Sequence, residues 1–261
     1  MTIFNGAPAE VPLATNPLVK VIVQLKFPMN ALISTNEGVA PFQSALRPRY
    51  PLMKKADQLS FLVGPNSISN SPTSVWRISD LQETWFVVLG SDFIALETGA
   101  YESRSDFMDR WLEVLSALAT ADLVPTRCDR IGVRYINRVE RGEFLDGMEN
   151  YLNQEFIGVG RLGFSEEVEV VASVSQVHYR MEEYEVRAVW GTIPSNVALL
   201  PGIEPVSHKS WMLDVDVFTE LGMPFEVSEI SLRTRQFSEQ SHAFFRWATN
   251  DKFLRLYGGR I

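Results

Sequence analysis

The chain has few of the features that mark secreted and membrane-embedded proteins. Its single cysteine, Cys128, cannot form an internal disulfide, so a reducing compartment fits best. No hydrophobic run approaches the roughly 18 residues of a membrane span. The N-terminus also lacks the basic residues and apolar core of a signal peptide. These absences predict a cytoplasmic protein with no membrane association.

A basic excess and the common enzyme motifs are missing as well. The formal net charge is −8, and such a field repels a phosphate backbone, so nucleic acid is not an expected partner. The acidity fits a basic protein partner better. There is no Walker A loop, Rossmann glycine fingerprint, Gly-x-Ser-x-Gly elbow or paired-cysteine zinc motif. The easily recognised enzyme classes are thereby excluded, and the sequence predicts no catalytic residue, cofactor or metal.

What is present is an ordinary globular composition. Of the 261 residues, 46% are hydrophobic and 21% are charged, and sixteen Phe, six Trp and seven Tyr can fill a sizeable core. Residues 1–16, rich in Ala, Pro, Thr and Asn, are predicted to form a flexible arm. The remainder is expected to fold as one large domain or as two smaller ones.

Period-two and helical patterns follow one another twice along the chain. The first round is predicted as a strand at 19–27, a short helix at 41–46, strands at 59–63, 75–78, 85–89 and 93–97, and a helix at 105–119. The second is predicted as a strand at 130–139, a helix at 144–156, strands at 168–179, 184–190 and 211–218, and a helix at 229–248. Ser103 opens the helix of the first round with a capping-box pattern.

Consecutive hairpins favour a mainly antiparallel sheet over a parallel one. The predicted fold is therefore α+β, with two tandem β-α-β-β-β-α-like halves at 17–125 and 126–261 and long helices packed on one sheet face. The halves form either two domains or one joint domain. Such a repetition suggests a cleft between the two copies.

Arginines follow one face of the second-half strand. Arg130, Arg134 and Arg138 are spaced by four, which places neighbouring arginines of the row about 13 Å apart in a strand. Such a row suits a phosphorylated or carboxylated ligand, because guanidinium groups bind these anions through two hydrogen bonds. The alternative is purely structural pairing with acids on neighbouring strands, and it is favoured. The acids considered are Glu167, Glu169, Glu182, Glu183 and Glu185.

Two acids and a histidine complete the candidate site. Asp214 and Asp216 share one strand face, where they are suited to a hard cation or to acid–base work. A metal site needs further ligands, so solvent-facing acids or partners for the arginine row are favoured. His242 lies on the last helix and is either a pocket residue or a packed one. Cys128 stands near Arg127 and Arg130, an environment that lowers a thiol pKa.

Five stretches stand out together with His242: NPLVKVIVQLKFP at 16–28, WRI at 76–78, DFIALET at 92–98, RIGVRYINR at 130–138 and LDVDVF at 213–218. In these stretches the chain resembles a set of uncharacterised prokaryotic proteins of similar length, distributed sporadically among bacteria and archaea. The family brings no established activity. Its sporadic distribution implies accessory roles such as phage defence or mobile-element maintenance.

Three hypotheses about function follow. The first, which is favoured, is a non-catalytic binding or regulatory protein, an accessory partner in a prokaryotic defence or toxin–antitoxin-like system, with a protein partner or self-association. The second is a small-molecule binder for an anionic or amphipathic ligand held in a cavity between sheet and helices. The third is an enzyme of unrecognised class that uses Asp214, Asp216 and His242. In this interpretation the first half is scaffold and the second half carries the function.

Overall fold

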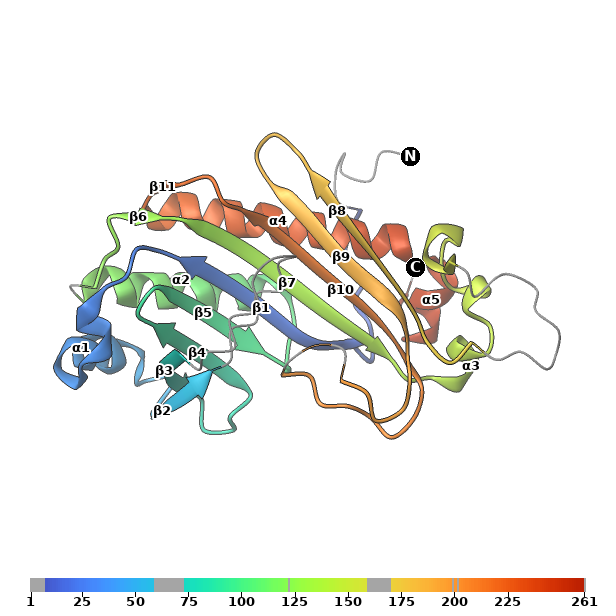
Figure 1. Cartoon of the computed structure of the whole chain (residues 1–261), viewed down its shortest axis with the longest axis horizontal. Helices are drawn as coiled ribbons and strands as arrows, with labels where there is room; N and C mark the ends of the chain where they lie inside the picture. Colours follow the sequence, from blue (N-terminus) through green and yellow to red (C-terminus); the bar gives the residue numbers. More distant parts are fainter. Residues whose placement is uncertain are drawn as a thin grey trace. The chain divides into compact units, whose positions relative to one another are not determined.

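The fold is α+β, as predicted, with a mainly antiparallel nine-stranded sheet and helices (Figure 1). The computed structural model describes residues 8–58, 73–121, 123–158, 170–198, 200 and 202–260. The strand order in the sheet is β2-β3-β4-β5-β1-β7-β10-β9-β8, and β6 and β11 form a separate two-stranded ladder. No helix in these described ranges is both long and apolar enough to cross a membrane.

Two compact units divide the chain, and both are discontinuous in sequence. Unit 1 consists of Met1–Val19, Arg134–Val217 and Phe237–Ile261, and unit 2 of Lys20–Val133 and Phe218–Gln236. The equivalence of the two predicted halves remains a prediction.

Unit 2 contains most of the first predicted half. Its elements are β1 (Leu18–Lys26), η1 (Ala31–Ser34), α1 (Asn36–Leu46), β2 (Leu52–Gln58), β3 (Thr73–Ser79), β4 (Trp85–Gly90), β5 (Phe93–Thr98), α2 (Arg104–Thr120), β6 (Arg127–Cys128) and β11 (Met223–Pro224), of which β1 begins in unit 1. Val21, Val23 and Leu25 of β1 are fully buried, and Trp111 of α2 is buried with them. The alternation in β1 and the apolar stripe of α2 explain this core, because each element has one apolar side to cover.

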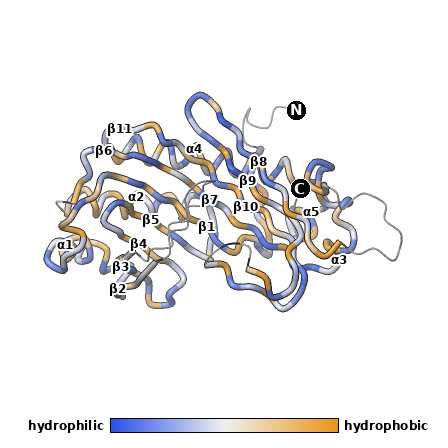
Figure 2. Tube along the Cα trace, in the orientation of Figure 1, coloured by the Kyte–Doolittle hydropathy of each residue, from blue (hydrophilic) through white to orange (hydrophobic). Residues whose placement is uncertain are grey.

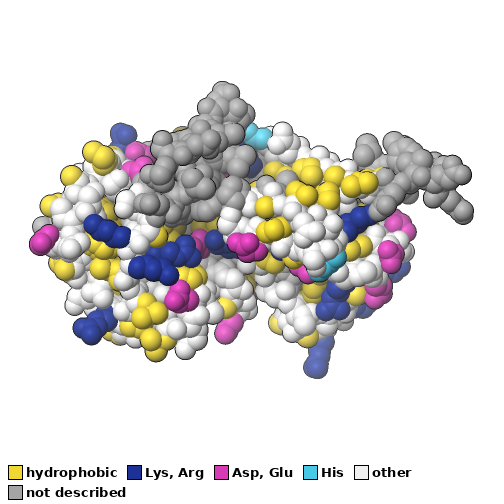
Figure 3. Space-filling model, turned by 60° about the horizontal axis from the view of Figure 1, so that its bottom comes forward, with side chains coloured by type: hydrophobic (Ala, Val, Ile, Leu, Met, Phe, Trp, Pro, Cys, Tyr) yellow, Lys and Arg dark blue, Asp and Glu magenta, His cyan; other side chains and the backbone are white. Residues whose placement is uncertain are grey.

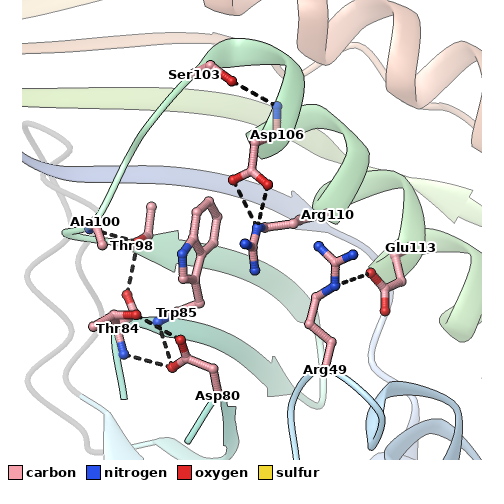
Figure 4. A network of polar contacts seen from close by, with 10 residues as sticks. All are labelled: Arg49, Asp80, Thr84, Trp85, Thr98, Ala100, Ser103, Asp106, Arg110 and Glu113. Carbon is pink, nitrogen blue, oxygen red and sulfur yellow. Dashed lines mark hydrogen bonds and ion pairs between the residues drawn. The ribbon is translucent and has the colours of Figure 1, made fainter. Parts of the chain in front are cut away.

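Arg110 of α2 lies beside Trp85 of the β4–β5 hairpin within unit 2 (Figure 4). Ser103 caps α2 by accepting a hydrogen bond from the Asp106 amide at 3.2 Å, as its capping pattern predicts. One turn later, Arg110 binds Asp106 and places its guanidinium 4.1 Å from the centroid of the Trp85 ring. The helix is therefore held both by its apolar stripe and by a stacked cation.

Two local predictions for unit 2 require correction. The helix predicted from Pro41 begins at Asn36, because Thr35 caps it and accepts a hydrogen bond from the Gly38 amide, and Pro41 lies inside it. The second correction is an addition, because the sequence predicted no strand at β2. This strand lies at the end of the sheet and is exposed, and Lys54 and Lys55 interrupt any apolar pattern in it. The strand predicted at 59–63 lies outside the described residues.

Unit 1 contains most of the second predicted half. Its elements are β7 (Arg130–Val139), α3 (Gly142–Leu145), η2 (Met148–Asn150), η3 (Gln154–Phe156), β8 (Ser173–Arg180), β9 (Glu185–Ile193), β10 (Ser210–Thr219), α4 (Val227–Ala248) and α5 (Asp251–Leu256), of which β7, β10 and α4 begin or end in unit 2. Its core is aromatic: Phe144 packs on Trp211 and Phe253 at centroid distances of 5.5 and 5.7 Å. Phe156 packs in the same way on Trp190, at 4.9 Å. The tip of the β8–β9 hairpin is hydrophilic (Figure 2).

Two segments of unit 1 depart from simple expectations. The helix predicted at 144–156 is only the short α3, followed by the 3-10 turns η2 and η3, with Gly147 between α3 and η2. In the predicted arm, Ala14 and Thr15 donate backbone hydrogen bonds to the Tyr257 carbonyl at 2.9 and 3.2 Å. This part of the arm is therefore attached to the end of α5.

Candidate functional site

The structure brings two of the predicted site residues into direct contact. Arg134 of β7 donates from Nε to Oδ1 of Asp214 at 2.8 Å and from Nη2 to Oδ2 at 2.7 Å. The two side chains are only 17% and 6% exposed. Arg134 thus pairs with an acid on β10, and that acid is one of the two aspartates named as possible partners for the arginine row.

Burial and charge act against each other in this pair. Burial lowers the pKa of Arg134, because it disfavours the charged guanidinium. The hydrogen bonds to Asp214 and the charges of Asp214 and Asp216 outweigh burial, so the pKa of Arg134 is raised above its ordinary value. Burial also raises the pKa of the Asp214 carboxyl, and Arg134 offsets part of that rise. Because Arg134 engages both carboxylate oxygens, the pair forms a neutral, directed structural contact.

The other two arginines of the predicted row have different environments. Arg130 is 6% exposed, and its guanidinium lies 4.6 Å from the centroid of the Phe218 ring. The Nε of Arg138 is buried, and no described residue accepts a hydrogen bond from it. Glu185, an acid expected to pair with the row, binds Arg180 at 3.0 Å and also contacts His178. Glu167 and Glu169 lie outside the described residues.

His242 lies on the other side of β7 from the Arg134–Asp214 pair. The Tyr135 and Ser238 hydroxyls are 2.7 Å apart, so this side of β7 faces α4. Neighbouring strand residues point to opposite faces, which puts Arg134 on the face away from α4. His242 is four residues after Ser238 and shares its helix face. The convergence of Asp214 and His242 that the enzyme hypothesis requires is therefore not favoured by this geometry.

Cys128 does not have the environment expected from its arginine neighbours. The residue is 1% exposed, and burial together with the charge of Asp129 raises its pKa to about 12. Arg127, expected to favour the thiolate, instead binds Asp129 at 2.7 Å. In the part of the chain that the structure describes, no three His, Cys, Asp or Glu side chains gather in a way that would hold a metal ion.

A second charged cluster, not predicted from the sequence, lies in unit 2. Glu97 of β5 is buried, with its side chain 5% exposed, and contacts Lys20 of β1 at 2.9 Å and Arg77 of β3 at 3.0 Å. The cationic side chains are more open, at 19% and 28%. The guanidinium of Arg77 is stacked 4.0 Å from the centroid of the Phe86 ring. We call Lys20, Arg77 and Glu97 the basic triad.

The triad stands on the sheet face of unit 2 that points away from α2, which we call the outer face. Trp85 contacts Phe107 of α2, and the next residue, Phe86, pairs with Glu97 across β4 and β5 on the opposite face. An apolar cluster occupies the same face. It contains Val75, Val88 and Ala95, packed with Ile22, Ala56, Phe86 and Phe93.

The register places the apolar cluster directly beside the triad. Arg77 pairs with Val88, and Val88 pairs with Ala95 on the next strand. Lys26, on the same face of β1 as Lys20, has its pKa lowered by burial and by the charge of Arg130. In Figure 3, Lys and Arg side chains gather beside hydrophobic ones on the left of the view, over elements of unit 2. The outer face therefore has partly exposed cations beside an apolar cluster whose central residues are buried, on a chain with a net charge of −8.

The chain matches no protein-family model, and no curated protein matches its sequence. The resemblance described above therefore remains a prediction. The sequence holds one indication of the triad. Each of the stretches at 16–28, 76–78 and 92–98 contains one of its charged residues, Lys20, Arg77 and Glu97 respectively. Strand pairing, which the sequence does not specify, makes them neighbours.

Proposed function

We propose that this protein acts by non-catalytic binding and that the outer face of unit 2 is its binding surface. The observation that carries the proposal is the basic triad beside an apolar cluster. Glu97, buried with two cations, fixes the positions of Lys20 and Arg77 at the edge of that cluster. A guanidinium held in place and still 28% exposed is suited to contact an anionic group of a ligand or partner.

The Arg134–Asp214 pair supports binding over acid–base chemistry. A general base needs a carboxylate oxygen within reach of a substrate proton. Both oxygens of Asp214 instead accept hydrogen bonds from Arg134. In biological terms the proposal is an accessory, regulatory role beside a prokaryotic defence or toxin–antitoxin-like effector, which the family resemblance implies.

A small anionic or amphipathic ligand is the second candidate, and the triad favours it specifically. Native mass spectrometry of the purified protein, before and after denaturation, tests for a retained small molecule. Co-purification with the products of neighbouring genes tests for a protein partner. Arg77→Gln removes a cation of the triad, and Arg49→Gln is a matched control because Arg49 forms a separate, more exposed pair with Glu113.

The expected result is a retained ligand or partner that is lost in Arg77→Gln and kept in Arg49→Gln. If neither assay recovers a bound species, the binding proposal is wrong. If a species is recovered equally with both variants, the outer face is not the binding surface.

A further inference from the structure

We propose that Lys26, the last residue of β1, is a modification site whose amine is acylated by a small acyl phosphate. This inference goes beyond the proposed binding function and does not depend on it. It comes from the contacts that the lysines of the sheet make, from the cation beside Lys26 and from the partial exposure of its side chain.

The first step is that Lys26 has no acidic partner. Within the part of the chain that the structure describes, no side chain forms an ion pair or a hydrogen bond with its ammonium group. Other lysines of the same sheet are paired, because Lys20 binds Glu97 at 2.9 Å and Lys54 contacts Glu83 at 3.4 Å. A carboxylate at such a distance stabilises the protonated amine. Lys26 lacks this stabilisation.

The second step is the neighbouring cation. The Asp129 amide donates a hydrogen bond to the Lys26 carbonyl at 2.8 Å, so the next residue, Arg130, lies beside Lys26. The guanidinium of Arg130 is 4.6 Å from the centroid of the Phe218 ring, and a methyl group added at Gly132 would lie 2.6 Å from its Nη1. The ring and the glycine therefore hold this guanidinium against the sheet, on the strand that follows β1 in the strand order.

The third step is the effect of these surroundings on the amine. Burial, and after it the charge of Arg130, lowers the pKa of Lys26, although Asp92 and Glu220 act in the opposite direction. Each unit by which a lysine pKa falls makes the neutral amine about tenfold more abundant at neutral pH. Desolvation or a second cation is how proteins activate lysine as a nucleophile. The side chain of Lys26 is still partly exposed, so a small donor can reach it.

The reaction is an acyl transfer from phosphate to nitrogen. The lone pair of the neutral Lys26 Nζ attacks the acyl carbon, and the bond from that carbon to the phosphate oxygen breaks. Phosphate leaves with the bonding pair, and a proton of the amine passes to solvent. The products are an amide and inorganic phosphate, so the step balances without a further reactant. Because the amide is neutral, acylation removes one cation from the outer face of unit 2.

The test treats the full-length protein with acetyl phosphate at pH 7.5 and measures the initial acetylation rate of each lysine by peptide mass spectrometry. Lys252 is the internal reference, because its side chain is exposed. Lys26 is expected to react at least threefold faster than Lys252 in the native protein. In urea the two rates should converge, since unfolding removes both the burial of Lys26 and its cationic neighbour.

Substitutions with opposite expected signs separate the electrostatic cause from damage to the fold. Arg130→Gln should slow acetylation of Lys26 at least twofold, and Arg130→Lys, which keeps the charge, should restore the rate. Asp92→Asn, at an exposed position, removes a charge that raises the pKa of Lys26 and should therefore speed the reaction. The inference is overturned if Lys26 reacts no faster than Lys252 in the native protein, or if Asp92→Asn and Arg130→Gln slow the reaction alike. Neither result bears on the binding assays of Arg77→Gln, so the two proposals fail separately.

Discussion

The Arg134–Asp214 pair offers the sharpest test of how unit 1 is stabilised. Arg134→Met keeps much of the side-chain volume but leaves Asp214 buried, 6% exposed, without its cation. Removing one partner of a buried ion pair costs about 3–5 kcal/mol of unfolding free energy. Asp214→Leu should cost less, because Asp216 still contributes favourable charge to Arg134. The double variant Arg134→Met/Asp214→Leu should recover most of the loss, since no uncompensated charge remains.

The pH dependence of Arg134→Met follows from the same burial. Desolvation already raises the pKa of Asp214 in the native protein. Loss of Arg134 removes the hydrogen bonds and the positive charge that lower this pKa, so it rises further in the variant. A carboxyl with a folded-state pKa above its unfolded value of about 3.9 favours the folded state at low pH. That contribution is lost as the pH rises through the raised pKa. The destabilisation of Arg134→Met relative to wild type should therefore be larger at pH 7.5 than at pH 4.5.

Urea unfolding followed by tryptophan fluorescence and circular dichroism measures these free energies. Arg49→Met is the control, because its pair with Glu113 is 44% and 34% exposed and such pairs contribute about 0–1 kcal/mol. The reasoning fails if Arg134→Met costs less than about 1 kcal/mol, or if the double variant is as unstable as the two single losses added together.

Three further changes test other parts of the fold. Cys128, buried and with a pKa raised to about 12, should react with a thiol reagent at pH 8 much more slowly in the native protein than in urea, and equal rates would contradict its burial. Ser103→Ala should lower the unfolding free energy by about 1 kcal/mol through loss of the α2 cap, whereas Ser105→Ala, at an exposed position, should have little effect in the same melts. Gly191→Ala should destabilise by about 2 kcal/mol or more, because its φ is +150° and the new methyl group would lie 1.8 Å from a carbonyl oxygen of β8. Gly142→Ala, with open space around it, should fold normally, and equal melting temperatures for the two glycine variants would refute the argument.

Elements with one apolar side could be predicted from the sequence, and elements without one could not. The strand at 19–27 and the helix at 105–119 correspond to β1 and α2, because each has a regular apolar face over its whole length. The helix at 144–156 was wrong because apolar spacing alone hides the turns around Gly147. β2 was missed for the opposite reason, since an exposed strand at the end of a sheet needs no apolar face.

The candidate site shows a similar division. Alternation along a strand predicts which neighbours share a face with Arg134 on β7 and with Asp214 on β10. Only the pairing of β7 with β10 shows that these two side chains lie on the same face of the sheet. The triad is harder to predict, because Lys20, Arg77 and Glu97 come from three strands that are not consecutive in sequence. Each looks like an ordinary solvent-facing charge when its strand is considered alone.

The number of cations around each buried carboxylate separates a structural pair from a binding site. Asp214 has one arginine that engages both of its oxygens, so its charge is neutralised and its geometry is fixed. Glu97 has two cations, one at each oxygen, and the contact with Arg77 lacks a hydrogen bond. Stability alone does not require the second cation, because one would neutralise the carboxylate and each further desolvated charge adds cost. Arg77, partly exposed and stacked on Phe86 without a hydrogen bond to Glu97, is instead suited to an anionic group from outside the chain, which is why we place the proposed binding surface on the outer face of unit 2 rather than on the arginine row of β7.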